Sequence, residues 1–295
     1  PVSLFGFGGG AYYHMKQTGI GNMPVSEIGK TTSGISYAPD KNSGLGLKAS
    51  VVFGLTGGEK AFNGDAEFGI NFTSHGGIGH ISFNGNGYFA TQDFSVNTAD
   101  IMKKAEHIVG NENVEVNIPK DAEKSQLYGN VKLVYDFPNS CFHASCDIYA
   151  NIGGGLIKGV GSGGRAGYGV MHFEPSDWYI HLGTPDNPNK ISVLNLATMS
   201  NYFMAGKSVP ELPLPPQEVI AGLGINPQEY ASRTNSTALA DGSGFALGSY
   251  FSFDTGERSY LFFYGRFGWG LGFDILMKNY GEVACERSTD FGVNG

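Results

Sequence analysis

The tripeptide Asp254-Thr255-Gly256 is the sequence in which aspartic proteases carry a catalytic carboxylate. That chemistry requires two carboxylates that share one proton. The sequence has no second Asp-Thr-Gly or Asp-Ser-Gly, and Asp241-Gly242-Ser243 has a different order. Because Asp, Thr and Gly are also favoured in tight turns, we predict that Asp254 is a turn residue. We name no catalytic residue and favour a non-enzymatic role, with a hydrolase of unrecognised type as the enzymatic alternative.

Metal-ligating side chains gather in the middle of the sequence. The cysteines are Cys141, Cys146 and Cys285. On one strand, Cys141 and His143 would share a face while Cys146 would point to the opposite, apolar face, because successive side chains alternate. His172 and His181 lie on the two arms of an expected hairpin and become near neighbours there. We predict that Cys146 is a core thiol, name no metal ligand and expect less than one zinc per chain.

A glycine-rich segment offers the composition of a phosphate-binding loop. Gly153-Gly154-Gly155 precedes Lys158, and further glycines follow at positions 161, 163 and 167. A phosphate loop needs a strand before it and a helix N-terminus after it. Strand-like alternation follows here instead, and no Ser or Thr stands directly after Lys158. We therefore predict a mobile or closely packed glycine segment, without cofactor-binding residues and without a cofactor.

These residues lie on predicted β-strands. The strands are indicated by apolar side chains at every second position, a pattern typical of half-buried strands. Alternation runs through 45–55, 66–72, 81–89, 127–137, 142–152, 167–173, 178–182 and 245–277. Turn residues at 75–77, 138–140, 174–177 and 254–257 separate the arms. The helical spacing of 99–109 predicts one short helix, and Asn226-Pro227 predicts the start of a second.

The last strand carries the main architectural prediction. Seventeen alternating residues from Leu261 to Met277 would extend on the order of 55 Å, which indicates a barrel or a large wrapped sheet. Gly268, Gly270 and Gly272 form a face without side chains, which predicts that an aromatic ring, another backbone or a bend lies against it. We expect the opposite, aromatic row with Trp269 to be buried against protein, covered by the proline-rich segment 209–216 and the helix after it.

The predicted fold is therefore mainly β, with long antiparallel hairpins in a meander that form a large sheet, sandwich or barrel, and with one or two short helices. We divide the chain into a β-rich region at 1–208, a proline arm with short helices at 209–240, and a long hairpin region at 241–295. The last region is expected to complete the same sheet system as the first.

Composition excludes several functional classes. Among 295 residues there are 46 glycines and 38 aromatics, only 16% of residues are charged, and the net charge is −8. With no basic run longer than Lys103-Lys104, nucleic-acid binding is excluded as a function. No stretch approaches the roughly 18 consecutive apolar residues of a transmembrane helix. The chain begins at Pro1 rather than Met, and we expect it to be a piece of a longer protein.

Two non-enzymatic functions fit this pattern. The first is a structural or assembly segment of a large extracellular or envelope protein, with protein partners or self-assembly. The second is an outer-membrane β-barrel or part of one, the only membrane association that the sequence supports, with the Leu, Phe and Trp row facing lipid. In the sequence analysis we place the soluble assembly first, because the long non-strand segment at 209–240 interrupts a barrel.

Three blocks carry a resemblance to known proteins. They are Trp178–Pro185, Tyr202–Gly206 with the proline arm, and Phe267–Asp274. These blocks resemble segments of very large surface or secretion-associated β proteins of gliding-type bacteria. The resemblance covers about the last 130 residues, implies a cell-surface or exported location, and transfers no functional residue.

Overall fold

A computed structural model describes residues 1–18, 36–91, 125–207, 209, 243–256, 258–260, 263–279 and 288–294. The prediction of a mainly β chain is confirmed, because every regular element among these residues is a strand apart from the single 3-10 turn η3 at Ser162–Gly164. The expected helices at 99–109 and after Asn226, and the prolines from Pro210 to Pro216, lie outside the described residues.

The first half of the chain contributes eight strands. They are β1 (Val2–Tyr13), β2 (Met15–Thr18), β3 (Ser36–Pro39), β4 (Ser43–Leu55), β5 (Phe62–Thr73), β6 (Ile78–Thr91), β7 (Ser125–Asp136) and β8 (Cys141–Ile152). The second half contributes β9 (Ile157–Gly159), β10 (Gly167–Phe173), β11 (Trp178–Leu182), β12 (Asn189–Val193), β13 (Ala197–Gly206), β14 (Ser243–Asp254), β15 (Arg258–Tyr260), β16 (Phe263–Gly265), β17 (Gly268–Asn279) and β18 (Ser288–Asn294).

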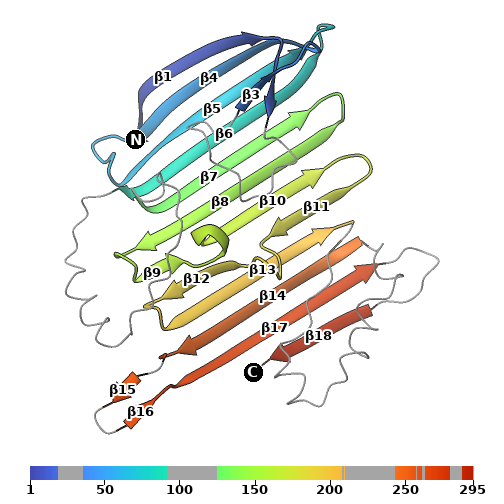
Figure 1. Cartoon of the computed structure of the whole chain (residues 1–295). Helices are drawn as coiled ribbons and strands as arrows, with labels where there is room; N and C mark the ends of the chain where they lie inside the picture. The colour runs from blue at the N-terminus through green and yellow to red at the C-terminus, as the bar shows by residue number, and fades with distance from the viewer. Residues whose placement is uncertain are drawn as a thin grey trace.

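Almost all of these strands belong to one antiparallel sheet (Figure 1). Its main path runs β1-β4-β5-β6-β7-β8-β10-β11-β13-β14-β17-β18, and the short strands β9 and β12 pair with each other between β8 and β13. Pairs β2–β3 and β15–β16 form separate two-stranded sheets. Strands β1 and β18 are therefore the two edges of the sheet.

The hairpins lie where turn residues predicted them. The turn between β5 and β6 contains Gly76 at a φ of 91°, a conformation that glycine adopts without steric cost. The turn between β7 and β8 contains Pro138 and Ser140, and the turn between β10 and β11 spans 174–177. These tight connections fix the register of each long pair, since loop length sets which residues stand opposite each other.

The register gives the sheet one continuously apolar face. Neighbouring residues across ten strands, from β4 to β17, are all apolar along one row. That row consists of Ala49, Phe68, Phe83, Leu133, Ala144, Met171, Ile180, Ala205, Phe245 and Met277. We call the surface that carries this row the apolar face, and the opposite surface, which carries Asp65, Asn86, Asn130, Asp147 and Tyr168, the polar face.

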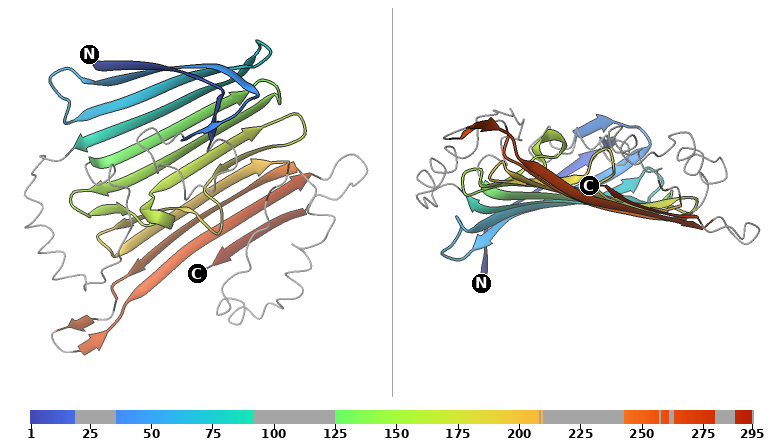
Figure 2. Two further views of the ribbon diagram at one scale, coloured as in Figure 1. Left: turned by 45° about the horizontal axis from the view of Figure 1, so that its top comes forward. Right: turned by 90° about the horizontal axis from the view of Figure 1, so that it is seen from below.

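Burial is inverted relative to a water-soluble sheet. On the apolar face, Phe68 is 48% exposed and Leu271 is 57% exposed, whereas Asn84 and Asp147 on the polar face are 2% and 3% exposed. The predicted burial of the aromatic row is therefore wrong for cover within this chain, because Trp269 is 53% exposed. Figure 2 shows that the large sheet is a single layer, and the small described sheet β2–β3 contacts it on the polar face, through the hydrogen bond from Asn71 to the Met15 carbonyl.

The predicted 17-residue strand is also wrong. The structure divides it into β16 and β17, with Arg266 and Phe267 outside both strands. Strand β16 pairs with β15 in a small hairpin that projects beyond the sheet in Figure 1, while β17 pairs with β14 and β18. Arg266 forms an ion pair with Asp254, the last residue of β14, which fixes the chain at this break.

The buried apolar cluster lies on the polar face, near the C-terminal end of the sheet. It consists of Tyr202, Met204, Val209, Ala246 and Leu276, with Tyr250 packed against it. Val209, directly before the proline arm, therefore packs on the surface opposite Trp269. Val209, a described residue after β13, thus contributes to the cover of the polar face.

Tyrosine rings lie over glycines of neighbouring strands in this region. A Cβ on Gly272 would collide with the ring of Tyr250, and a Cβ on Gly248 would collide with the ring of Tyr202. The hydroxyl groups of both tyrosines donate hydrogen bonds to the carboxylate of Asp274. The prediction that an aromatic ring covers the glycine face of the last strand is thus confirmed at Gly272.

Substitution of Gly272 tests this contact. We expect Gly272→Ala to lower the free energy of unfolding by about 1–3 kcal/mol, because the methyl group displaces the Tyr250 ring. Gly87→Ala is the matched control inside a strand, since its Cβ would meet Phe62 and Phe89 at 3.7 Å, an ordinary contact. Urea unfolding measures both variants, and equal losses for the two would contradict the account.

Candidate functional site

Asparagine side chains build a hydrogen-bond network on the polar face. The Asn86 amide donates to Asp65 Oδ2 at 2.8 Å, and Tyr128 donates to Asn86 Oδ1 at 2.8 Å. The Asn130 amide donates to Asn84 Oδ1 at 3.0 Å and to Asn86 Oδ1 at 2.7 Å. A buried amide without a hydrogen-bond partner lowers the stability of the fold. The network gives these buried asparagines partners, so it stabilises the polar face.

A buried ion pair lies at the centre of the polar face. The Arg165 guanidinium donates from Nη1 to Asp147 Oδ1 at 2.8 Å, and the two side chains are only 6% and 5% exposed. Arg165 Nε also donates to the carbonyl of Ser162 at 3.0 Å, and the guanidinium lies 4.8 Å from the Tyr168 ring centroid. This pair joins strand β8 to the segment that follows η3.

The glycine-rich segment holds Arg165 in place. The Gly161 amide donates to the carbonyl of Arg165 at 2.8 Å. A Cβ on Gly159 would lie 2.6 Å from the carbonyl oxygen of Gly164, so this backbone approach requires glycine. The prediction of a closely packed glycine segment is confirmed for this stretch, and Gly153-Gly154-Gly155 forms the turn between β8 and β9.

The metal-ligating residues occupy the faces that strand alternation predicts. Cys141 and His143 lie on the polar face, and Cys146 lies on the apolar face, where a Cβ on Gly169 would contact its sulfur. His172 stands opposite His143 in the register, with the two Nδ1 atoms 3.3 Å apart. The sequence predicted that His181 would be a near neighbour of His172. In the register His172 stands opposite Tyr179 instead, and the Tyr179 ring stacks on both His172 and His181.

An open pocket adjoins these residues at the ends of the strands. Its lining is polar in most positions and includes Asp40, Asn42, Ser43, Asn71, Thr73, His80, Asp136, Asn139, Cys141 and His143. The lining comes from β4 to β8 and from the turns at this end of the sheet. Sequence reasoning missed this pocket because its residues are far apart in the chain, and only the strand register brings them together.

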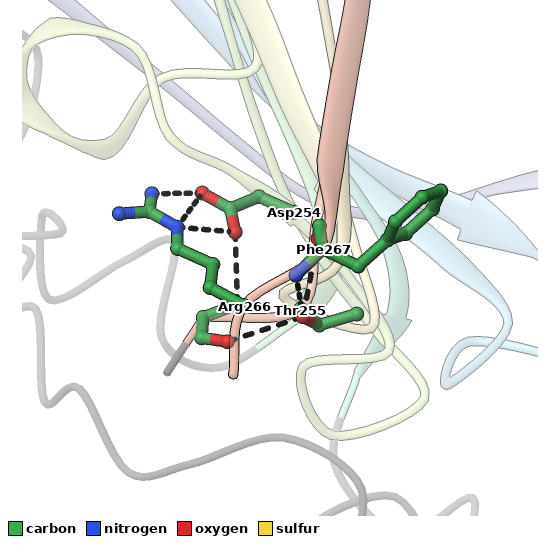
Figure 3. Close-up of polar contacts among 5 residues, drawn as sticks. Asp254, Thr255, Arg266 and Phe267 are labelled. Atoms are coloured by element: carbon green, nitrogen blue, oxygen red, sulfur yellow. Dashed lines mark hydrogen bonds and ion pairs between the residues drawn. The ribbon is translucent and has the colours of Figure 1, made fainter. Parts of the chain in front are cut away.

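Asp254 holds the turn after β14 (Figure 3). Its Oδ1 accepts hydrogen bonds from the Gly256 amide at 2.9 Å and from Arg266 Nε at 2.8 Å, and a second bond joins its Oδ2 to Arg266 Nη2. The Arg266 guanidinium and the Gly256 amide lower the pKa of Asp254 to about 2. Asp254 is the last residue of β14 rather than a residue of the turn, so the predicted turn begins directly after it, and its carboxylate faces an arginine.

Protease assays test the consequence. We expect the chain to cleave no peptide substrate at acidic pH, because a carboxylate paired with arginine cannot share a proton with a second carboxylate. Asp254→Asn should therefore leave the rate of peptide hydrolysis unchanged. Peptide hydrolysis that the Asn variant abolishes would contradict this assignment.

The described residues thus offer two extended surfaces and one pocket with metal-ligating side chains. No described segment forms a helix long and apolar enough to cross a membrane. No protein-family model, no curated protein and no solved structure matches this chain. The geometry of the two faces is therefore the basis for a functional assignment.

Proposed function

We propose that this chain forms the wall of a transmembrane β-barrel in the outer membrane, with the apolar face toward lipid and the polar face toward the lumen. The observation that carries the proposal is the row of apolar residues across ten adjacent strands, on one side of a sheet whose other side buries asparagine and aspartate. The large side chains Phe68, Met171 and Met277 of this row are 48%, 39% and 41% exposed. A surface of this extent is larger than water-soluble monomers expose, and it needs an apolar environment.

Strand length supports lipid as that environment. Strands β5, β7, β8, β14 and β17 have 12 residues each. At 3.4 Å per residue they extend about 40 Å, and a tilt of about 40° leaves about 30 Å along the membrane normal. That height equals the thickness of the hydrocarbon core.

Aromatic residues at both ends of the apolar face give further support. Near the turns at 137–140 and 174–177, one row runs across β7, β8, β10 and β11 and consists of Tyr135, Phe142, Phe173 and Trp178. At the opposite end, Phe62 stands opposite Phe89, and Phe253 stands opposite Trp269. Membrane barrels place such aromatic girdles at the two interfaces with water.

The edges of the sheet support strand addition. The main path has 12 strands and every pair is antiparallel, so β1 and β18 run in opposite directions. Pairing of β1 with β18 would therefore be antiparallel like every other pair, and an even strand number is usual in bacterial barrels. Closure within one molecule, or strand addition from another chain, would cover both edges.

Flotation with lipid vesicles tests the proposal. The refolded chain is expected to float with phosphatidylcholine vesicles in a density gradient and to stay with them after an alkaline carbonate wash, because lipid covers its apolar face. A folded, monodisperse chain that stays in the aqueous fraction would contradict a barrel wall. That result would favour the soluble assembly segment of an extracellular or envelope protein, whose apolar face a second sheet covers.

A further inference from the structure

The polar face carries a cluster of metal ligands at the ends of β8 and β10. Cys141, His172 and Glu174 each offer one ligand atom, and these atoms lie within 4.8 Å of one another. His172 Nδ1 lies 3.9 Å from Cys141 Sγ and 3.3 Å from His143 Nδ1. The strand register creates this cluster, because it places His143 opposite His172 and Phe142 opposite Phe173.

Two of the separations, both to His172 Nδ1, are close to those of ligands around one zinc ion. With Zn–N near 2.0–2.1 Å and tetrahedral angles, two nitrogen ligands stand about 3.3 Å apart, and a nitrogen and a thiolate stand about 3.6 Å apart. The two Nδ1 atoms already have this spacing, and the Cys141 sulfur is a few tenths of an ångström farther away. His143 is not in the group of ligand atoms that lie within 4.8 Å of one another, so its side chain must turn toward Cys141 for all three residues to reach one ion.

Glu174 completes the arrangement from the other side of the His172 ring. Its Oε2 lies 3.6 Å from His172 Nε2, so the carboxylate attracts the proton on Nε2 and leaves Nδ1 free as a ligand. Tyr179 stacks on the same ring at 5.1 Å between centroids and fixes its orientation. The Glu174 side chain is 37% exposed, and the pocket reaches Cys141 and His143, so an ion can enter from solvent.

We infer that Cys141, His143 and His172 form a zinc-binding site on the polar face, with Glu174 as the residue that orients His172 through Nε2. Sequence reasoning expected less than one zinc per chain, because it considered Cys141 together with Cys146. Cys146 does lie on the other face, but β10 supplies His172 and Glu174 in its place. The site is independent of the environment of the apolar face.

Metal analysis of the folded full chain tests the site. We use a Cys285→Ser background and expect one equivalent of Zn²⁺ after dialysis. Cys141→Ser and His172→Ala should each weaken zinc binding at least tenfold in a competition titration with a chromophoric chelator. Cys146→Ser is the matched control and should bind as the background does. Co²⁺ in place of zinc should give a thiolate charge-transfer absorption that disappears in Cys141→Ser and persists in Cys146→Ser.

Several results would overturn the inference. These are less than 0.2 equivalents of zinc in the background protein, equal affinity in His172→Ala, or the same loss in Cys146→Ser as in Cys141→Ser. Circular dichroism of each variant verifies that the sheet has formed before metal is added. Glu174→Gln distinguishes a site from simple charge attraction, because it should weaken zinc binding less than Cys141→Ser does.

Discussion

Asp147→Leu is expected to lower the free energy of unfolding by about 3–5 kcal/mol, because it leaves the buried Arg165 charge without its partner. The two charged groups are 2.8 Å apart and almost wholly inaccessible to solvent. The double variant Asp147→Leu/Arg165→Met should recover most of the loss, since no unpaired charge then remains. Urea unfolding of the refolded chain in lipid or detergent measures each variant.

The exposed pair between Asp254 and Arg266 is the matched control. It joins the same two residue types, but its side chains are 40% and 60% exposed, so water screens the attraction. Asp254→Ala should therefore change global stability far less than Asp147→Leu. Losses of equal size in the two aspartate variants, or a double variant as unstable as Asp147→Leu, would show that Arg165 and Asp147 do not act as a buried pair.

Val51→Arg is expected to destabilise the chain by about 2–4 kcal/mol in a lipid bilayer, because it places a charge on the face that we propose to contact hydrocarbon. Val51 stands opposite Ala66 on β5, within the apolar face. The adjacent Val52 has the same depth but the opposite orientation, stands opposite Asp65, and is 48% exposed. Val52→Arg should therefore cost less than 1 kcal/mol, since an arginine there can approach Asp65.

This pair of variants separates the two environments of the sheet. The folded fraction is measured by urea titration in vesicles of one lipid composition, with both variants and the parent chain treated alike. If the apolar face bordered water in these samples, both arginines would be tolerated. Similar unfolding midpoints for Val51→Arg and Val52→Arg would therefore contradict lipid contact on the apolar face.

Hydrophobic alternation predicted the strands because side-chain period is a local property of the sequence. The arms around Phe68, Phe83 and Leu133 form long strands as expected, and the faces of Cys141 and Cys146 follow from their odd separation. Hydrophobic alternation did not predict the break between β16 and β17 at Arg266. It depends on an ion pair with Asp254, twelve residues earlier, which competes with continued alternation.

The environment of each face could not be derived from alternation alone. A period of two shows which residues share a side, but a row such as Trp269, Leu271 and Phe273 is equally apolar against a second sheet or against lipid. Register adds that the strands from β4 to β17 turn their apolar sides the same way, and the proposal of lipid contact rests on this observation. The cluster at His172 likewise depends on how β10 pairs with β8, across a connection that contains β9 and η3.

Tryptophan fluorescence gives the most direct test of lipid contact, because both tryptophans of the chain, Trp178 and Trp269, lie on the apolar face. They are 37% and 53% exposed, near opposite ends of the sheet. The chain is refolded in vesicles of ordinary phosphatidylcholine and of phosphatidylcholine brominated along its acyl chains. We predict that the brominated lipid quenches most of the emission, and that acrylamide in the aqueous phase quenches little. A folded chain whose emission is unaffected by brominated lipid and strongly quenched by acrylamide would contradict the central claim.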